Sequence, residues 1–199
     1  MMIRGDQLVV ASSAFAANTL REAVEFARKH PGTVNYGSFG NGSQPHLLFS
    51  LIAEREKVSL THIPYSGITP NLTALAAGDV QLGSGSAAVI AAYVASGKVK
   101  PLAIAGDAPV PQYPKVSTTT EQGFPYANVS IWYGLFAPAG TPAEVVSQAV
   151  LADQDFPAQQ VTAKGLAVVA NDGRQMRDAI AAEARATAAM ITAAGVVAE

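Results

Sequence analysis

The sequence predicts an α/β fold in which a parallel or mixed sheet is flanked by helices. Segments with strand character and segments with helical character alternate through residues 7–105. Hydrophobic residues make up 49% of the 199 residues, which is enough for a sizeable buried core. Glycine, proline and serine lie between the segments, as expected of connecting loops. This alternation is typical of sheets whose strands are connected through helices.

The first predicted helix has the clearest boundaries. It follows a short strand expected at residues 7–11. Thr19 and Glu22 have the spacing of a capping box, in which each side chain satisfies a free amide at the helix start. Four apolar residues then repeat at helical spacing, namely Leu20, Ala23, Val24 and Ala27. Pro31-Gly32 is expected to end this helix.

The remaining elements follow the same rhythm. Further strands are expected at residues 34–38, 58–63, 80–83 and 100–105. Helices are expected from about Pro45, from Thr69-Pro70 to Gly78, and over residues 87–95. After an irregular connection at 106–127, we expect a strand at 129–136, a second capping box at Thr141 to Glu144 and a final helix over about 173–194. Met176, Ile180, Thr187 and Ile191 lie along one side of that helix.

Composition and charge exclude several classes of function. Charged residues amount to 14% and the formal net charge is -2, so no basic surface exists to bind nucleic acid or an anionic membrane. The absence of cysteine excludes disulfides, thiolate catalysis and cysteine-ligated metals. No apolar run reaches the roughly 18 residues of a membrane span, so no direct membrane insertion is expected. Residues 1–6 lack the pattern of a secretory signal, and we expect this chain to carry none.

The loop Gly40-Asn41-Gly42-Ser43 is the sharpest local feature. It lies between a predicted strand and a predicted helix, and its glycines allow a ligand to approach the backbone closely. Ser43 or Gln44 would sit at the helix N-terminus, where free amides and the helix dipole favour an anion such as a carboxylate or phosphate. The alternative is a plain tight turn with a serine cap. The loop matches neither the P-loop nor the dinucleotide-binding pattern.

Three other loops are expected at the same edge of the sheet. They are Tyr65-Ser66-Gly67, Ser84-Gly85-Ser86 and Ala105-Gly106-Asp107. Ligands of open α/β sheets bind at the carboxyl ends of the strands. Backbone amides and hydroxyls in these loops would hold a carboxylate without lysine or arginine. Taken singly, each loop is equally well explained as ordinary loop composition.

Candidate catalytic and metal-binding residues do not form a recognisable set. We expect His30 to offset the dipole at a helix end, His46 to pack or to support the loop before it, and His62 to be half buried with its polar atoms satisfied. No pair of histidines has the spacing of a helical metal site. Ser84 lacks the first glycine of a nucleophile elbow, and Trp132 is expected to pack in the core or at a hinge. The sequence therefore predicts no catalytic residue, metal or cofactor.

Several short motifs run in a fixed order through nearly the whole chain. They occupy residues 34–38, 40–43, 46–47, 62–67, 78–80, 96–99, 102–104, 121–125 and 132–142. The most specific is Trp132-Tyr133-Gly134-Leu135-Phe136-Ala137-Pro138-Ala139-Gly140-Thr141-Pro142. In this order the motifs resemble the Bug-type periplasmic solute receptors of tripartite tricarboxylate transporters.

The resemblance implies a fold, a ligand class and a partner. The fold would be that of type II periplasmic binding proteins, with two α/β lobes joined by crossover strands. The ligand would be a small di- or tricarboxylate or a related organic acid, held without chemical change and delivered to the membrane subunits of the transporter. The resemblance also implies a periplasmic location. Its contact residues would be Ser38, Gly40, Asn41, Gly42, Ser43 and His46 in the first loop, with Tyr65, Gly67, Ser84, Gly85 and Ser86 nearby.

The resemblance also implies how the chain divides into lobes. Residues 14–127 resemble a complete second lobe, whereas 1–13 and 128–199 resemble only the return portion of the first, so lobe one is expected to be incomplete. One alternative is a truncated, non-transporting paralogue with a regulatory role or none. A third reading is an α/β enzyme that uses the loop at 40–43 for an anionic substrate.

Overall fold

The strand β1 (Met2–Ser12) joins two sheets in the computed structural model. The structure describes residues 2–106, 108–134, 136–142, 144–145, 166–170 and 173–196. Residues 2–6 pair with β6 (Ser130–Gly134) and residues 2–5 with β7 (Leu166–Ala170), both antiparallel. From Gln7 onward the strand lies between β4 (Leu82–Ser86) and β5 (Val99–Ile104). β1 is longer than the strand expected at 7–11, because its first half pairs in the smaller sheet and its second half in the larger one.

The larger sheet is mixed, with strand order β3-β2-β4-β1-β5. β2 (Val34–Ser38) pairs in parallel with β3 (Leu60–Pro64) on one side and with β4 on the other. β1 runs antiparallel to β4 and to β5. The expectation of a parallel or mixed sheet flanked by helices is therefore confirmed.

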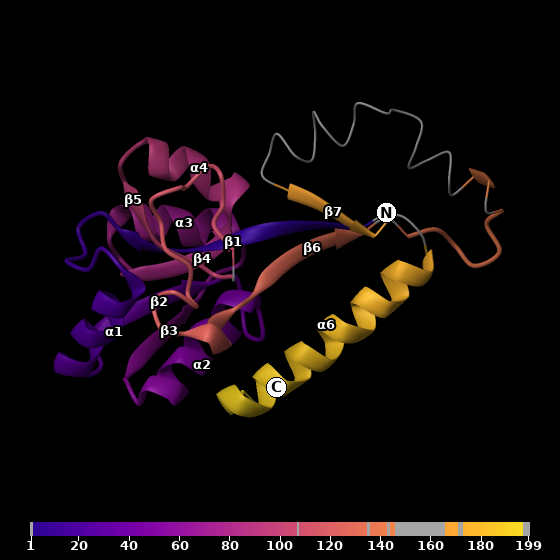
Figure 1. The fold of residues 1–199 in the computed structure, drawn as a ribbon. Helices are drawn as coiled ribbons and strands as arrows, with labels where there is room; N and C mark the ends of the chain where they lie inside the picture. Colours follow the sequence, from indigo (N-terminus) through magenta and orange to yellow (C-terminus); the bar gives the residue numbers. More distant parts are fainter. Residues whose placement is uncertain are drawn as a thin grey trace.

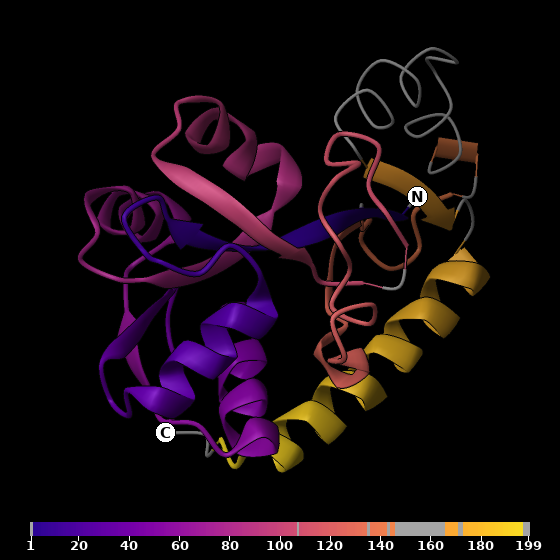
Figure 2. The same cartoon turned by 60° about the vertical axis from the view of Figure 1, so that its left-hand side comes forward.

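Two pairs of helices cover the two faces of this sheet (Figures 1 and 2). α1 (Leu20–Lys29) and α2 (Gln44–Glu56) pack on the face that receives Val9 and Ala11. α3 (Ile68–Ala77) and α4 (Ala87–Ala95) pack on the face that receives Leu8 and Val10. These four residues of β1 are fully buried, as expected for a central strand whose side chains alternate between two covered faces.

The helix boundaries follow from the residues expected to set them. Thr19 caps α1 by accepting a hydrogen bond from the Glu22 amide at 3.1 Å, and all four apolar residues predicted for its inner face are buried. Pro45 lies in the first turn of α2, as predicted. α3 begins at Ile68 after the N-cap Gly67, two residues before the start predicted at Pro70 with Thr69 as its cap. It ends at Gly78, whose positive φ favours glycine. α4 occupies the predicted residues 87–95.

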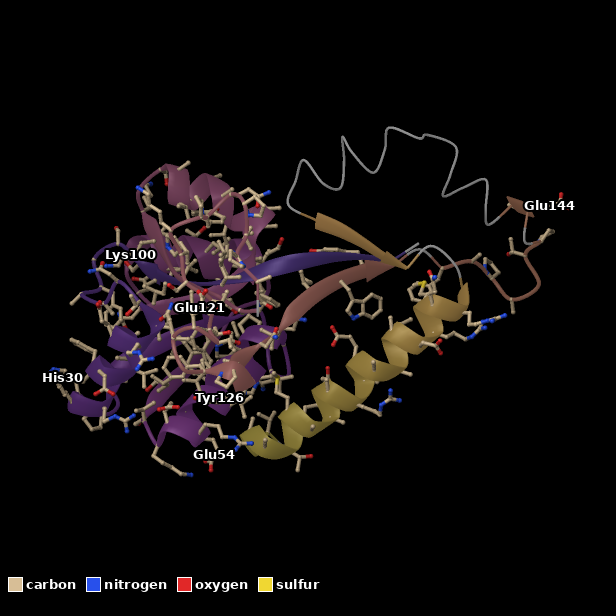
Figure 3. All side chains as sticks on the ribbon, viewed as in Figure 1. His30, Glu54, Lys100, Glu121, Tyr126 and Glu144 are labelled. Atoms are coloured by element: carbon tan, nitrogen blue, oxygen red, sulfur yellow. The ribbon has the colours of Figure 1, made fainter. Side chains whose placement is uncertain are left out.

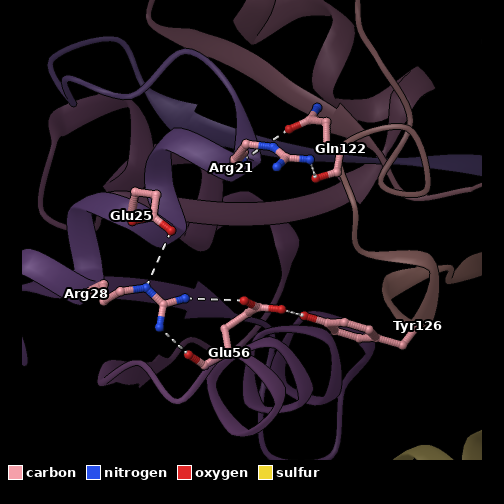
Figure 4. Close-up of polar contacts among 6 residues, drawn as sticks. All are labelled: Arg21, Glu25, Arg28, Glu56, Gln122 and Tyr126. Carbon is pink, nitrogen blue, oxygen red and sulfur yellow. Dashed lines mark hydrogen bonds and ion pairs between the residues drawn. The ribbon is translucent and has the colours of Figure 1, made fainter.

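The irregular segment that follows β5 is fastened to α1 and α2 by polar contacts (Figure 4). Arg21 contacts Gln122 through its backbone amide, at 3.2 Å from Oε1, and through its guanidinium. The Tyr126 hydroxyl donates to Glu56 Oε1 at 2.6 Å, and Arg28 pairs with the same carboxylate at 3.3 Å. These contacts hold the segment against the face covered by α1 and α2, although it contains only the short 3-10 helix η1 (Pro125–Ala127).

The smaller part of the protein consists of β6, β7, the first half of β1 and α6 (Gly173–Ala194). α6 begins beside the ends of β6 and β7 and crosses to α2 at its other end (Figure 1). Met176 is buried and packs with Trp132, whereas Thr187 and Ile191 of the predicted inner side are exposed. The helix expected after Thr141 lies outside the described residues apart from Glu144 and Val145. Within the described part of the chain, no helix is long and apolar enough to cross a membrane.

Candidate ligand-binding site

Three helices begin at one edge of the larger sheet. β2, β3 and β4 run parallel, so their carboxyl ends share this edge, and Ser38 lies beside Pro64 in the strand register. α2 begins at Gln44 after β2, α3 at Ile68 after β3, and α4 at Ala87 directly after β4. We call the residues that link these strands to these helices, 38–46, 65–67 and 86–87, the rim.

The helix starts at the rim are left without side-chain caps. Ser43 is the N-cap residue of α2, but its hydroxyl donates to the carbonyl of Gly40 at 2.6 Å and does not accept from an α2 amide. Gly67, the N-cap of α3, has no side chain, and Ser86, the N-cap of α4, makes no capping hydrogen bond. None of the three helices has an acidic residue in its first turn. The partial positive charge of three helix ends is therefore directed to the rim without an acidic first-turn residue to offset it.

The start of α1, which lies outside the rim, is built in the opposite way. Thr19 caps the helix with its side chain, and Glu22 lies in the first turn. The Glu22 carboxylate also accepts from the Asn18 amide at 2.7 Å. The same chain thus caps and neutralises one helix start while leaving those at the rim open, which is the arrangement expected of an anion-binding edge.

The loop between β2 and α2 is open toward solvent and folded on itself by local hydrogen bonds. Gly40 has φ 120° and Gly42 has φ 72°, and no heavy atom lies within 4 Å of a Cβ built on either residue. The Gly42 amide donates to Nδ1 of His46 at 2.9 Å, and the Ser43 amide donates to the Gly40 carbonyl at 3.2 Å. Two glycines thus provide left-handed backbone and free space where a ligand could approach.

A stack of aromatic rings supports this loop from the sheet side. The His46 ring lies on the His62 ring at 4.0 Å between centroids, and His62 lies on Tyr36 at 5.0 Å. His62 Nε2 is 2.7 Å from the Ser38 hydroxyl. Burial lowers the pKa of His46, and burial together with the nearby His46 lowers the pKa of His62 to about 4. His62 is therefore neutral at neutral pH, and His46 holds the loop as a hydrogen-bond acceptor.

The segment Ser84-Gly85-Ser86 corrects the expected position of one loop. All three residues lie in β4 and are buried, where they pair with β1 opposite Val9, Leu8 and Gln7. The Ser84 hydroxyl accepts from Nε2 of the buried Gln7 at 3.0 Å. Glycine and serine are typical of loops, but here the pairing with β1 continues the strand. Only Ser86 reaches the rim, as the N-cap of α4.

A cavity of about 300 Å³ lies beside the rim, between α2, the segment 128–132 and α6. We call it the α2–α6 cavity. Its lining residues are Gln44, Leu47, Asn128, Val129, Trp132, Glu183, Ala186, Thr187 and Met190. Gln44 is the first residue of α2, so the cavity and the rim share this helix start. Glu183 is the one charged residue among the described residues that line the cavity.

A family model described as "Tripartite tricarboxylate transporter family receptor" matches residues 1–196 of the chain. The chain belongs to this family. The predicted resemblance to this receptor family is thereby confirmed. Among the described residues, no group of three His, Asp or Glu side chains is arranged to hold a metal ion.

The chain is also similar to individual proteins and solved structures. A protein of Bordetella pertussis (strain Tohama I), named only as a UPF0065 protein, is 32% identical over 139 residues, which are 70% of this chain and 43% of that protein. The periplasmic binding protein BugD has a TM-score of 0.84 at 27% identity, covering 98% of this chain and 68% of that one. MatC from Rhodopseudomonas palustris, solved with bound malate, has a TM-score of 0.78 at 27% identity, covering 96% and 67%. The chain spans less than half the length of the Bordetella protein.

The structure of this family member brings most of the predicted contact residues together. Those at the rim are residues 38–43, His46, the turn from Tyr65 to Gly67, and Ser86. Two of these segments are in direct contact, because the Tyr65 amide donates to the Ser38 carbonyl at 2.9 Å. Ala105 and Gly106 follow β5, whereas Asp107 lies outside the described residues. The sequence predicts Gln44 at the helix start but not the cavity that Gln44 lines. Glu183, which lines the same cavity, is marked by no local pattern.

Proposed function

We propose that this chain binds a small organic carboxylate at the rim, as part of an extracytoplasmic solute receptor. The observation that carries the proposal is the contrast between three uncapped helix starts at the rim and the capped, acidic start of α1. The rim contains no lysine or arginine. Its amides and hydroxyls would therefore have to hold the ligand's negative charge, which helix N-termini do through oriented N–H groups.

The proposed contacts divide into two groups. The first group lies at the rim and would face the carboxylate or shape its site; it consists of Ser38, Gly40, Asn41, Gly42, Ser43, His46, Tyr65, Gly67 and Ser86. Ser84 and Gly85 are buried in β4 and would act by holding the strand end in place. The ligand would be a di- or tricarboxylate or a related organic acid, and the malate bound to MatC supports this class.

The wider biological role is proposed with the ligand class. The receptor would deliver its carboxylate to the membrane subunits of a tripartite tricarboxylate transporter, and it would work in the periplasm. We also propose that residues 14–127 represent the second lobe and that 1–13 and 128–199 belong to the first. The two sheets joined through β1 support a division into two parts.

The substitution Gln44→Glu tests the proposal at the rim. A carboxylate in the first turn of α2 would occupy the same electrostatic position as the ligand, and it would stabilise the helix. We expect this variant to melt at the same temperature or slightly higher and to bind dicarboxylates such as malate about tenfold more weakly, because like charges would then share the site. Calorimetric titration with a panel of di- and tricarboxylates measures the effect.

The matched control is Gln175→Glu, which adds the same charge to the first turn of α6. This helix start lies at the end of α6 remote from α2 (Figure 1). The control should bind carboxylates as the wild type does. Equal weakening in both variants would point to a nonspecific charge effect, and no binding of any carboxylate by the wild-type chain would overturn the proposed function.

A further inference from the structure

The loop between β2 and α2 is held at two points by one pair of stacked histidines. Near its end, the Gly42 amide donates to Nδ1 of His46 at 2.9 Å. At its start, the Ser38 hydroxyl lies 2.7 Å from Nε2 of His62 and accepts from the Gly40 amide at 3.1 Å. The planes of the two imidazole rings are nearly parallel, with an angle of 5° between them and 4.0 Å between their centroids. A single stack therefore fixes the two attachment points of the loop relative to each other.

The position of the proton on His46 follows from this geometry. A backbone N–H can only donate, so Nδ1 of His46 carries a lone pair and the neutral ring carries its proton on Nε2. A second proton would bind at Nδ1, where it would face the Gly42 N–H and break the contact. By comparison, Nε2 of His62 can either donate to or accept from the Ser38 hydroxyl, so this contact tolerates both charge states. The fold of the loop therefore requires a neutral His46 in particular.

The titratable groups around His46 are compatible with a neutral ring. His62 of β3 would be a like charge if it were protonated, but its pKa of about 4 keeps it neutral. Tyr36 of β2, stacked on His62, and Tyr65 of the neighbouring turn have pKa values raised by burial and stay uncharged. The first turn of α2 has no acidic residue, and from α6 Glu183 lines the α2–α6 cavity, of which His46 is not a lining residue. Burial accordingly lowers the pKa of His46.

We propose that His46, seated on His62, is a positioning residue of the carboxylate site: its neutral ring holds the loop in the binding form, and proton uptake at Nδ1 releases the loop and weakens the ligand. This inference rests on the proposed function, because it assumes that a carboxylate binds at the rim. It adds a dependence on pH whose direction distinguishes positioning from direct contact. A charged imidazole that touched the carboxylate would strengthen binding in acid, whereas an imidazole that positions the loop weakens it.

Two substitutions separate the ring of His46 from its acceptor atom. His46→Phe keeps an aromatic ring on His62 but offers Gly42 no acceptor. His46→Asn places an amide oxygen near the position of Nδ1, without the ring and without a group that takes up a proton. The probe is malate or, if another member of the panel of di- and tricarboxylates binds more tightly, that acid. At about pH 8 we expect His46→Phe to bind at least about tenfold more weakly than the wild type, and His46→Asn to recover affinity to within about threefold. His30→Asn, at the end of α1, is the control and should bind as the wild type does.

The pH dependence of binding provides the readout that a merely structural role would not change. Relative to His46→Asn at the same pH, the affinity of the wild type should fall at least about threefold between about pH 8 and about pH 5, and this comparison cancels the titration of the ligand itself. In a proton NMR titration of the wild type, the pKa of His46 should be lower with the ligand bound than without it. The reason is reciprocity: a ligand that needs the neutral ring opposes proton uptake.

The possible outcomes separate this inference from the proposed function. The NMR measurement needs no variant, so it decides the matter even if His46→Phe does not fold. If the wild type binds the probe but His46→Phe binds it equally well, or if the pKa of His46 is unchanged or raised by the ligand, this inference is wrong and the proposed function stands. If the wild type binds no carboxylate of the panel, both fail.

Discussion

The stack of His46 and His62 beneath the rim should make the protein less stable in acid, mainly through His62. The pKa of His62 is lowered from 6.5 to about 4, first because the ring is partly buried and then because His46 lies against it. The folded protein therefore takes up this proton only near pH 4, whereas the unfolded chain takes it up near pH 6.5. Between these values the unfolded chain holds more protons, so the free energy of unfolding falls as the pH is lowered through this window.

The size of the effect follows from the two pKa values. Their difference corresponds to about 3 kcal/mol, of which about 2 kcal/mol would be lost by pH 5. The ring is only partly buried, and solvent screening reduces the figure, so we expect about 1 kcal/mol between about pH 7.5 and about pH 5. Urea unfolding at the two pH values measures it. The variant His62→Gln retains a polar group near the Ser38 hydroxyl but has no ring to protonate. It should therefore not show this loss of about 1 kcal/mol in the free energy of unfolding.

A second histidine provides the control for this experiment. His30 ends α1 and lies at the outer end of that helix, away from β6 and α6 (Figure 3). His30→Gln leaves the stack intact and should lose as much stability on acidification as the wild type. The reasoning would be refuted if His62→Gln and the wild type lost the same free energy of unfolding between the two pH values.

Three further substitutions test how the rim and its supports are held. Gly37→Ala would place a Cβ against Oδ1 of the buried Asn71. This overpacking should lower the free energy of unfolding by about 1–3 kcal/mol in urea titrations. An unchanged free energy of unfolding would contradict the close approach of Asn71 to Gly37. Tyr126→Phe removes the hydroxyl that donates to Glu56 and should lower the free energy of unfolding by about 1–2 kcal/mol in the same titrations; a smaller loss than about 0.5 kcal/mol would contradict a role for this contact. Thr19→Ala removes the α1 cap and should cost about 1 kcal/mol, without changing carboxylate affinity if α1 lies outside the site.

Much of the larger sheet could be predicted because its residues carry local patterns. The inner face of α1 shows helical spacing of apolar residues, and all four of those residues are buried. β2 and α4 have the predicted boundaries because each is bordered by residues that end regular structure. From its glycines and its position between a strand and a helix, the loop at 40–43 can be interpreted either as an anion-binding feature or as a plain tight turn with a serine cap. The structure adds that Ser43 leaves the helix start uncapped, which the sequence did not show.

The errors arise where long-range pairing decides the structure. Ser84 and Gly85 have the composition of a loop, yet β1 pairs with them across the sheet and holds them in a strand. The first half of β1 includes Arg4 and Asp6, which conceal its strand character, and it is defined by pairing with β6 and β7. The α2–α6 cavity joins Gln44 and Glu183, which are far apart in the chain, so no local pattern announces it.

The most direct measurement of the central claim is a nitrogen–proton NMR titration that follows the backbone amides at the helix starts. Addition of malate should shift the first-turn amide of His46 and those at the starts of α3 and α4, saturably and together, because these N–H groups would bind the carboxylate. The Glu22 amide, already bonded to Thr19, should not move, and the neutral diamide of malate should cause no comparable shift. Shifts confined to residues outside the rim, or equal shifts with the diamide, would contradict the account.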